Sequence, residues 1–351
     1  MPELMAMDGL TVVVERPPAA ARPPILLIHG YLGGAWYFEK YQGLFAELGY
    51  PSYAVNLRGH HGSRPVADVA RVPFAAYVED ALEVARRLAE LERGVPPIVI
   101  GHSMGGLIAQ KVAEAGMARA LVLLCPAPPR GIPLISPHLF LRQLRHLPNL
   151  VRSRPIVGTL GDSRALILNR TPREEHEALD ARFVAGSART GLELLRGVPV
   201  DEARVRCPVL AISASHDRFV PPDVVRKVAA KYGAPFREYF GHAHFMIWEP
   251  GWDEPAREIE HWLDHALGLG HHATPGIIHL LELRNQRGKT VQLAFRDGHT
   301  VNAKVIAVDF EPPAEIIYEV RSVVEIGPEH LAGVRAGRVT AVPLDELRDF
   351  R

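Results

Sequence analysis

The sequence predicts an α/β fold built on a mostly parallel sheet, with a smaller β-rich unit after it. Short, continuous apolar runs alternate with stretches in which apolar residues return every three or four positions. Continuous apolar strands are buried on both faces, and helices between the strands cover both faces of a parallel sheet. The length of 351 residues suits one large domain and one small one.

The expected strands and helices follow in chain order. Strands are expected at 10–15, 24–29, 51–57, 97–100, 120–125, 208–213 and 235–240. Helices are expected at 74–93, directly after Ser103, and at 255–267, because apolar residues there recur at helical spacing.

One long interval, from 126 to about 204, contains no strand pattern. It opens on the proline-rich stretch PAPPRGIPLISP, and leucines then recur every three residues at 141, 144 and 147. The stretch TPRE at 171–174 has the spacing of a capping box with proline at the first helical position. We therefore expect a helical cap, at about 127–204, over the edge at which the strands end.

The composition changes after residue 267. The stretch GLGHHATPG at 268–276 is typical of a linker. Its two adjacent histidines point in opposite directions in most conformations, so we expect them to face solvent rather than to bind a metal. Asp297-Gly298 then joins two alternating runs at 290–295 and 301–308, which predicts a hairpin, and further strands are expected at 316–324 and 338–342. The predicted domains are an α/β domain at 1–267 and a small β-rich domain at 277–351.

Charge and cysteine content exclude several classes of protein. The 40 basic and 40 acidic side chains cancel, so the chain as a whole has no charge excess that favours nucleic acid. Two cysteines, both in apolar runs, rule out a disulfide framework and favour buried thiols. No apolar run approaches the roughly 18 residues that span a bilayer, and the N-terminus has no signal-peptide pattern, so we expect a cytoplasmic protein.

A motif for a nucleophile lies between the strand at 97–100 and the next helix. The stretch GHSMG at 101–105 fits G-x-S-x-G, in which a sharp turn from strand to helix exposes the serine hydroxyl. The glycines allow the helix and strands to approach closely, and the helix N-terminus favours negative charge beside the serine. We therefore predict that Ser103 is a nucleophile rather than part of a structural glycine turn.

An acid and a base for that serine follow in the order expected on such a sheet. Asp217 lies in the loop after the strand at 208–213, where an orienting carboxylate is expected. The stretch GHAHF at 241–245 offers two histidines. We choose His244 because an apolar run begins directly after it, and His242 is the alternative. His102 is expected to pack structurally.

Two backbone amides are candidates for an oxyanion hole. The Met104 N–H follows the nucleophile, and Tyr31 lies in the glycine-rich loop HGYLGG after the strand at 24–29. That loop lacks G-x-G-x-x-G and G-K-[ST], so it does not predict a dinucleotide or phosphate site. Serine chemistry of this kind requires no cofactor and no metal.

Taken together, these stretches resemble the α/β-hydrolase superfamily over about 10–267. The matching pieces are ILLIHGYLGG, NLRGHHGS, GHSMGG, SASHDRFVPP and GHAHFMIWEPGW. Asn56 and His61 depart from the usual form of the second piece, which we interpret as a loop that braces the site. The resemblance implies an α/β-hydrolase fold with Ser103 as nucleophile, Asp217 as acid and His244 as base.

The tail, RGKTVQLAFRDGHTVNAKVIAVD, resembles the opening strands of an Sm-like or SH3-like small barrel. Its basic residues are balanced by acidic ones, and an aromatic stacking platform is not evident. We therefore favour homo-oligomerisation or docking of a partner over RNA binding for this domain.

These observations predict a serine hydrolase that cleaves carboxylic esters of small molecules through an acyl-enzyme. Apolar residues are expected to contact a hydrophobic acyl or alcohol group: Trp36, Leu139, Phe140, Leu141, Leu144, Leu147 and Phe245. One alternative is a lyase or C–C hydrolase on the same scaffold. Another is a binding or regulatory protein, which the added β-rich tail suggests.

Overall fold

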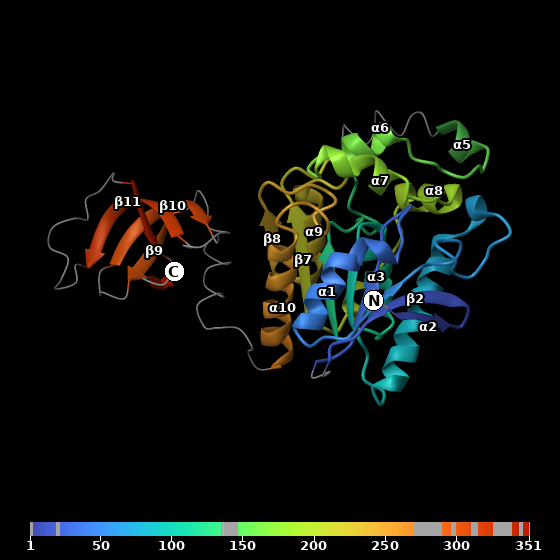
Figure 1. Ribbon diagram of the computed structural model, residues 1–351, viewed down its shortest axis with the longest axis horizontal. Helices are drawn as coiled ribbons and strands as arrows, with labels where there is room; N and C mark the ends of the chain where they lie inside the picture. The colour runs from blue at the N-terminus through green and yellow to red at the C-terminus, as the bar shows by residue number, and fades with distance from the viewer. Residues whose placement is uncertain are drawn as a thin grey trace. The chain divides into compact units, whose positions relative to one another are not determined.

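The computed structural model describes residues 3–18, 22–134, 136, 147–269, 290–295, 300–309, 315–325, 339–343 and 347–350 (Figure 1). Contacts between Cα atoms divide the chain into two compact units, Met1–Gly270 and His271–Arg351. Within the described residues, every helix is too short or too polar to cross a membrane.

The first unit is built on an eight-stranded sheet in the order β1-β2-β4-β3-β5-β6-β7-β8. Its strands are β1 (Glu3–Met7), β2 (Leu10–Glu15), β3 (Ile25–Ile28), β4 (Ser52–Val55), β5 (Ile98–His102), β6 (Ala120–Leu124), β7 (Val209–Ala214) and β8 (Phe236–Tyr239). Strands β1, β2 and β4 pair antiparallel, and every other neighbouring pair is parallel. The predicted mostly parallel sheet is confirmed.

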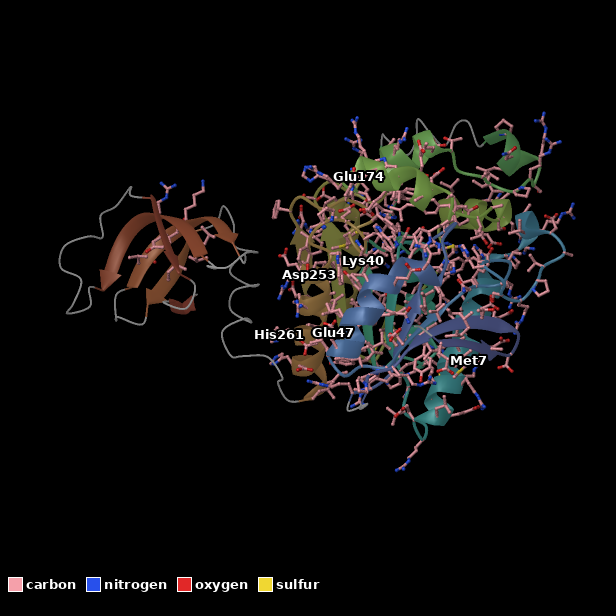
Figure 2. All side chains as sticks on the ribbon, viewed as in Figure 1. Met7, Lys40, Glu47, Glu174, Asp253 and His261 are labelled. Carbon is pink, nitrogen blue, oxygen red and sulfur yellow. The ribbon has the colours of Figure 1, made fainter. Side chains whose placement is uncertain are left out.

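Helices cover both faces of this sheet, and the strand residues alternate between two apolar layers whose side chains fill the space between sheet and helices (Figure 2). Leu26 and Ile28 face one layer with α2 (Phe74–Leu91), α3 (Met104–Glu114) and α9 (Pro222–Tyr232). Ile25 and Leu27 face the other layer with α1 (Glu39–Glu47) and α10 (Asp253–Leu267). All four strand side chains are fully buried, as the continuous apolar run predicts.

The interval between β6 and β7 consists of short helices, drawn in green at the top of Figure 1. They are α5 (Leu147–Val151), α6 (Leu160–Asp162), the π-helix η4 (Ser163–Ile167), η5 (Arg173–Glu175), α7 (His176–Asp180), α8 (Ala188–Arg196) and η6 (Glu202–Arg204). An isolated antiparallel bridge between Ile156 and Gly186 was not predicted. The remaining short helices, η1 (Ala35–Phe38) and η2 (Val69–Arg71), lie earlier in the chain.

The capping box predicted at Thr171 is wrong. Pro172 is extended, with φ −54° and ψ 137°, so η5 begins one residue later than predicted and has no side-chain cap. The Thr171 hydroxyl is buried without a hydrogen-bond partner. A capping box forms instead at Thr159 and Asp162, at the start of α6.

The second unit contains a five-stranded antiparallel sheet in the order β12-β11-β10-β9-β13. Its strands are β9 (Thr290–Phe295), β10 (Thr300–Asp309), β11 (Glu315–Glu325), β12 (Val339–Pro343) and β13 (Leu347–Phe350). β9 and β10 pair as the predicted hairpin requires, whereas the Asp297-Gly298 turn and 270–276 of the predicted linker lie outside the described residues. β13 was not predicted.

Candidate active site

Ser103 lies at a sharp turn between β5 and α3. Its backbone is left-handed, with φ 57° and ψ −121°, a conformation that costs a non-glycine residue free energy. The turn is held by a hydrogen bond from the Ser103 N–H to the Leu124 carbonyl, at 3.0 Å, and by one from the Gly106 N–H to the Ser103 carbonyl, also at 3.0 Å. The surrounding backbone therefore fixes a strained residue at the start of a helix.

Glycines at this turn are required by close backbone contact. A Cβ atom on Gly101 would overlap the carbonyl of Gly105, and one on Gly105 would overlap the carbonyl of Ile28 in β3. A side chain at either position would push α3 away from the sheet and displace Ser103. The predicted reason for the glycines is therefore confirmed.

The Ser103, His244 and Asp217 side chains form a continuous hydrogen-bonded series. His244 Nε2 lies 3.0 Å from Ser103 Oγ, and His244 Nδ1 lies 2.8 Å from Asp217 Oδ2. A carboxylate only accepts, so Nδ1 carries the hydrogen and Nε2 is free to accept the serine proton. All three residues are buried, and they follow the carboxyl ends of β5, β7 and β8 at one edge of the sheet.

Asp217 is held in place by two further donors. Its Oδ1 accepts hydrogen bonds from the Phe219 N–H at 2.7 Å and from the Val220 N–H at 2.8 Å. The Phe219 ring stacks on the His244 imidazole, with ring centroids 5.0 Å apart and planes inclined by 23°. Both the carboxylate and the imidazole therefore have one preferred orientation.

Two further histidines near the site, His242 and His102, have other partners. His242 Nδ1 lies 3.3 Å from Glu249 Oε2, so the structure brings His244 rather than His242 to the serine. His102 Nε2 donates to the His244 carbonyl at 2.7 Å. Burial lowers the pKa of His102 to about 3, so this ring stays neutral near pH 7.

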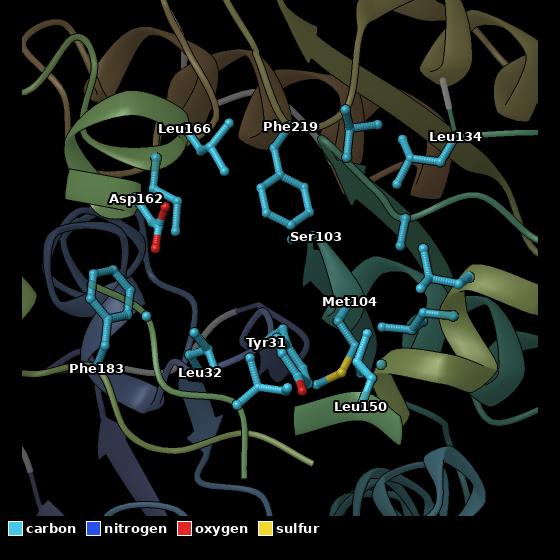
Figure 3. A pocket seen from close by; sticks show the side chains of 18 of the residues that line it. Tyr31, Leu32, Ser103, Met104, Leu134, Leu150, Asp162, Leu166, Phe183 and Phe219 are labelled. Atoms are coloured by element: carbon cyan, nitrogen blue, oxygen red, sulfur yellow. The ribbon is translucent and has the colours of Figure 1, made fainter. Parts of the chain in front are cut away.

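A cavity of about 820 Å³ opens above Ser103, and its floor includes Tyr31 and Met104 (Figure 3). Met104 is the first residue of α3, where a backbone N–H has no acceptor within the helix. The loop that carries Tyr31 passes close to the serine, because a Cβ on Gly30 would lie 3.0 Å from the Ser103 Cβ. Tyr31 and Met104, the residues predicted to supply the oxyanion donors, therefore line the same cavity as Ser103.

Two hydrogen bonds join this loop to the helical cap. The Tyr31 hydroxyl donates to the Ser187 carbonyl at 2.7 Å, and the Val184 N–H donates to the Leu32 carbonyl at 2.9 Å. Ser187 in turn donates through its hydroxyl to the carbonyl of Val72 in the main domain. The cap and the loop beside the serine are therefore one hydrogen-bonded assembly.

Apolar side chains from the cap and from the loop after β7 form most of the cavity wall. They include Ile132, Leu134, Leu150, Leu166, Phe183, Leu194 and Phe219. No spacing in the sequence distinguished these residues, because they come from short cap helices and connecting loops separated along the chain. The feature of the sequence that could have indicated some of these lining residues is the proline-rich stretch at the start of the cap, because it contains Ile132 and Leu134.

Two predicted substrate contacts need correction. Trp36 and Phe245 are absent from the cavity lining and pack beneath it in the apolar layer of α1 and α10. Phe245 is fully buried and stacks on Trp248, with planes 12° apart. Leu139, Phe140, Leu141, Leu144 and the side chain of Leu147 lie outside the described residues.

The loop that departs from the family pattern at Asn56 and His61 braces the turn after β3. Asn56 Oδ1 accepts a hydrogen bond from the Ala35 N–H at 2.7 Å, and the Ser63 hydroxyl donates to the Asn56 carbonyl at 2.6 Å. His61 has a left-handed backbone, with φ 42°, and its ring lies against Gly34. An asparagine oxygen therefore supplies the acceptor that this turn needs.

One group of side chains has the composition of a metal site. Ligand atoms of Cys125, Asp217 and His244 lie within 4.8 Å of one another. Burial and the Asp217 carboxylate raise the pKa of the Cys125 thiol, which favours its protonated form over the thiolate that binds metals. Asp217 and His244 are already hydrogen-bonded to each other, so this group fits serine chemistry better than metal binding.

Comparison with known proteins agrees with this fold. Residues 25–260 match the alpha/beta hydrolase family, and the chain belongs to that family. A monoacylglycerol lipase of Mycolicibacterium smegmatis is 26% identical over 271 residues, which cover 73% of this chain and 94% of that protein.

Solved structures show the same fold at lower identity. A monoacylglycerol lipase of Paleococcus ferrophilus aligns with a TM-score of 0.55 and 21% identity, covering 72% of this chain and 98% of that one. A soluble variant of the Saccharomyces cerevisiae monoglyceride lipase, bound to a substrate analogue, aligns with a TM-score of 0.59 and 16% identity, covering 75% and 94% of the two chains.

Proposed function

We propose that this chain hydrolyses carboxylic esters that carry an apolar acyl or alcohol group, with Ser103, His244 and Asp217 as a catalytic triad. The observation that carries the proposal is the hydrogen-bonded series of these three side chains at the floor of an apolar cavity. The similarity to a bacterial monoacylglycerol lipase over most of both chains supports the same reaction class.

The first step is attack of Ser103 Oγ on the ester carbonyl. His244 Nε2, 3.0 Å away, takes the serine proton as the new C–O bond forms. Asp217 holds the Nδ1–H and stabilises the imidazolium that results. His244 then returns the proton to the alkoxide, and the alcohol leaves the acyl-enzyme.

The tetrahedral intermediate carries negative charge on the former carbonyl oxygen. The backbone N–H groups of Met104 and Tyr31 are the donors that we assign to this oxygen, and the N-terminal end of α3 adds a favourable dipole. One such donor is worth roughly 10²–10³ in kcat. Water, activated by His244 in the same way, then hydrolyses the acyl-enzyme and restores the Ser103 hydroxyl.

The cavity favours apolar substrates of moderate size. A volume of about 820 Å³ lies within the range of small-molecule sites, and most of the lining side chains are aliphatic or aromatic. Each buried methylene of an acyl chain gains roughly 0.8 kcal/mol. We therefore propose that esters with medium-length acyl chains are bound better than acetyl esters.

Labelling with a fluorophosphonate probe and hydrolysis of p-nitrophenyl esters test this proposal. Ser103→Ala abolishes both, whereas Ser153→Ala retains both. Ser153 is a matched control because it is exposed and also has a left-handed backbone, with φ 50° against 57° for Ser103. Full ester turnover in Ser103→Ala contradicts the proposal, and probe labelling without turnover of any ester favours a binding or lyase role.

A further inference from the structure

A second cavity, of about 660 Å³, lies where the helical cap meets the loop that carries Asp217. It is lined by Arg164, Asn169, Arg170, Thr171, Arg173, His176 and Arg218, and we call it the arginine cavity. None of these residues lines the Ser103 cavity. Six of them lie in the stretch that runs from η4 to the first residue of α7. The seventh, Arg218, directly follows Asp217.

The arginine cavity carries a strong excess of positive charge. Among the described residues that line it, four of seven are arginines and none is acidic. Arg164 approaches Glu177 at 3.5 Å, but that glutamate is largely exposed, and Arg218 donates to the Ala165 carbonyl, at 3.3 Å. Among the residues that the structure describes, no carboxylate pairs with Arg170 or Arg173. All four arginines are exposed, so water and salt screen their mutual repulsion, and an anion held among them is attracted by each.

Three side-chain polar atoms of the lining residues have no hydrogen-bond partner within the described part of the chain. They are Thr171 Oγ1, His176 Nδ1 and Asn169 Oδ1. Thr171 and His176 are each 6% exposed, so bulk water does not readily form hydrogen bonds with them. His176 Nε2 must donate to the Thr171 carbonyl, 2.9 Å away, which leaves Nδ1 as an acceptor in the neutral ring. Buried polar groups without partners are rare in folded proteins and need an explanation.

We propose that the arginine cavity binds a phosphate group, either of a soluble phosphate ester or of a lipid headgroup. Guanidinium groups match the geometry of phosphate and bind it through paired hydrogen bonds. A singly protonated phosphate also presents a hydroxyl, which donates to an acceptor such as His176 Nδ1 or Asn169 Oδ1. Sulfate has the same shape but no hydroxyl at neutral pH, so it satisfies the arginines and leaves these acceptors unpaired.

Bound phosphate would connect the cap to the loop of the candidate acid. Arg164, Arg170 and Arg173 belong to the cap, and Arg218 belongs to the loop after β7. Hydrogen bonds already cross that boundary, from Asn169 Nδ2 to the His216 carbonyl at 3.2 Å and from the Arg218 side chain to the Ala165 carbonyl at 3.3 Å. An anion shared by arginines on both sides adds further links, so it stabilises the folded chain.

The test measures binding of inorganic phosphate to the full chain by calorimetry and by thermal unfolding, with sulfate as the comparison and chloride to equalise ionic strength. Phosphate at about ten times its Kd raises Tm by about 3 °C, and sulfate binds roughly tenfold more weakly. Neither readout requires ester hydrolysis, so the result is independent of the proposed catalytic function.

Two variants and one control locate the site. Arg170→Ala with Arg173→Ala weakens phosphate binding at least about tenfold, and Thr171→Val weakens it about fivefold while it retains all four arginines. The control, Arg152→Ala with Arg154→Ala, removes two exposed cap arginines that do not line the cavity and leaves Kd unchanged. Equal losses in both double variants, or equal binding of phosphate and sulfate, would overturn the proposal.

Vesicles distinguish the two sources of phosphate. Sedimentation with phosphatidic acid vesicles, but not with phosphatidylcholine vesicles, that is lost in the Arg170/Arg173 double variant identifies a lipid headgroup. Phosphate binding without vesicle binding identifies a soluble phosphate ester. Absence of both kinds of binding overturns the proposal.

Discussion

The floor and the roof of the Ser103 cavity are built in opposite ways. The floor is made by the loops after β3, β5, β7 and β8. It holds Ser103, His244 and Asp217 through buried hydrogen bonds and through glycines at which a Cβ atom would overlap the neighbouring backbone. The roof, made by the cap between β6 and β7, consists of short helices and contributes mainly apolar side chains. Under the function proposed above, the floor would set the chemistry and the roof the range of substrates.

The largest effect is expected at the floor. Asp217→Asn keeps the shape of the side chain but loses the negative charge that fixes the imidazole, so kcat for p-nitrophenyl esters falls by about 10⁴-fold. Asp223→Asn, at an exposed position in the first turn of α9, is the control and retains full activity. Steady-state kinetics near pH 7 measure both, and a loss below tenfold at Asp217 would remove it from the triad.

The second prediction concerns the close packing of Gly105 in the floor. Gly105→Ala places a methyl group against the Ile28 carbonyl, which cannot move without distorting β3, so the free energy of unfolding falls by about 3 kcal/mol. Gly43→Ala is the matched control, since Gly43 lies within α1 and a Cβ there meets no atom within 4 Å.

At position 43, alanine raises the free energy of unfolding by up to about 1 kcal/mol, because alanine has a higher helix propensity than glycine. Urea unfolding measures both changes. Equal stability of the Gly105 and Gly43 variants would show that close packing does not fix the serine turn.

The smallest effect is expected at the roof. Leu166→Trp fills part of the cavity wall from η4, so kcat/KM for long-chain esters falls by about tenfold while short-chain esters are unaffected. A chain-length series of aryl esters measures this, with Leu195→Trp as a control at a position of the same lining that is 57% exposed. A uniform loss across all chain lengths would contradict a separate role for the roof.

The floor was predictable from sequence because its chemistry depends on residues at strand ends. The stretches GHSMGG and SASHDRFVPP place Ser103 and Asp217 directly after short apolar runs, and parallel strands bring such ends to one edge. The choice of His244 over His242 also agrees with the geometry.

Contacts made by the roof were not predictable, because they join residues that no regular helix or strand spacing relates in the sequence. Phe245 shows the difficulty, since an apolar residue beside the base can face the cavity or the core, and here it faces the core. The arginine cavity brings Arg218 to cap residues more than 40 positions earlier in the chain, and no spacing in the sequence indicates this.

β1, α1 and α9 were missed for other reasons. β1 is an edge strand with mostly exposed side chains, so it lacks a continuous apolar run. α1 contains Gly43 near its middle, which weakens the helical pattern. α9 did carry usable signals, with Pro222 at its first turn and the left-handed Gly233 after its last.

The hydrogen bonds from Tyr31 to Ser187 and from Val184 to Leu32 have a consequence for engineering. Both cap partners are backbone groups, so a chimera that receives the cap of another hydrolase keeps these bonds only where the grafted backbone follows the same course. Where it does not, the amide of residue 31 shifts together with the grafted segment. Turnover would then change even though every triad atom is retained. Grafts that leave 184–187 native and exchange only the residues before them avoid this coupling.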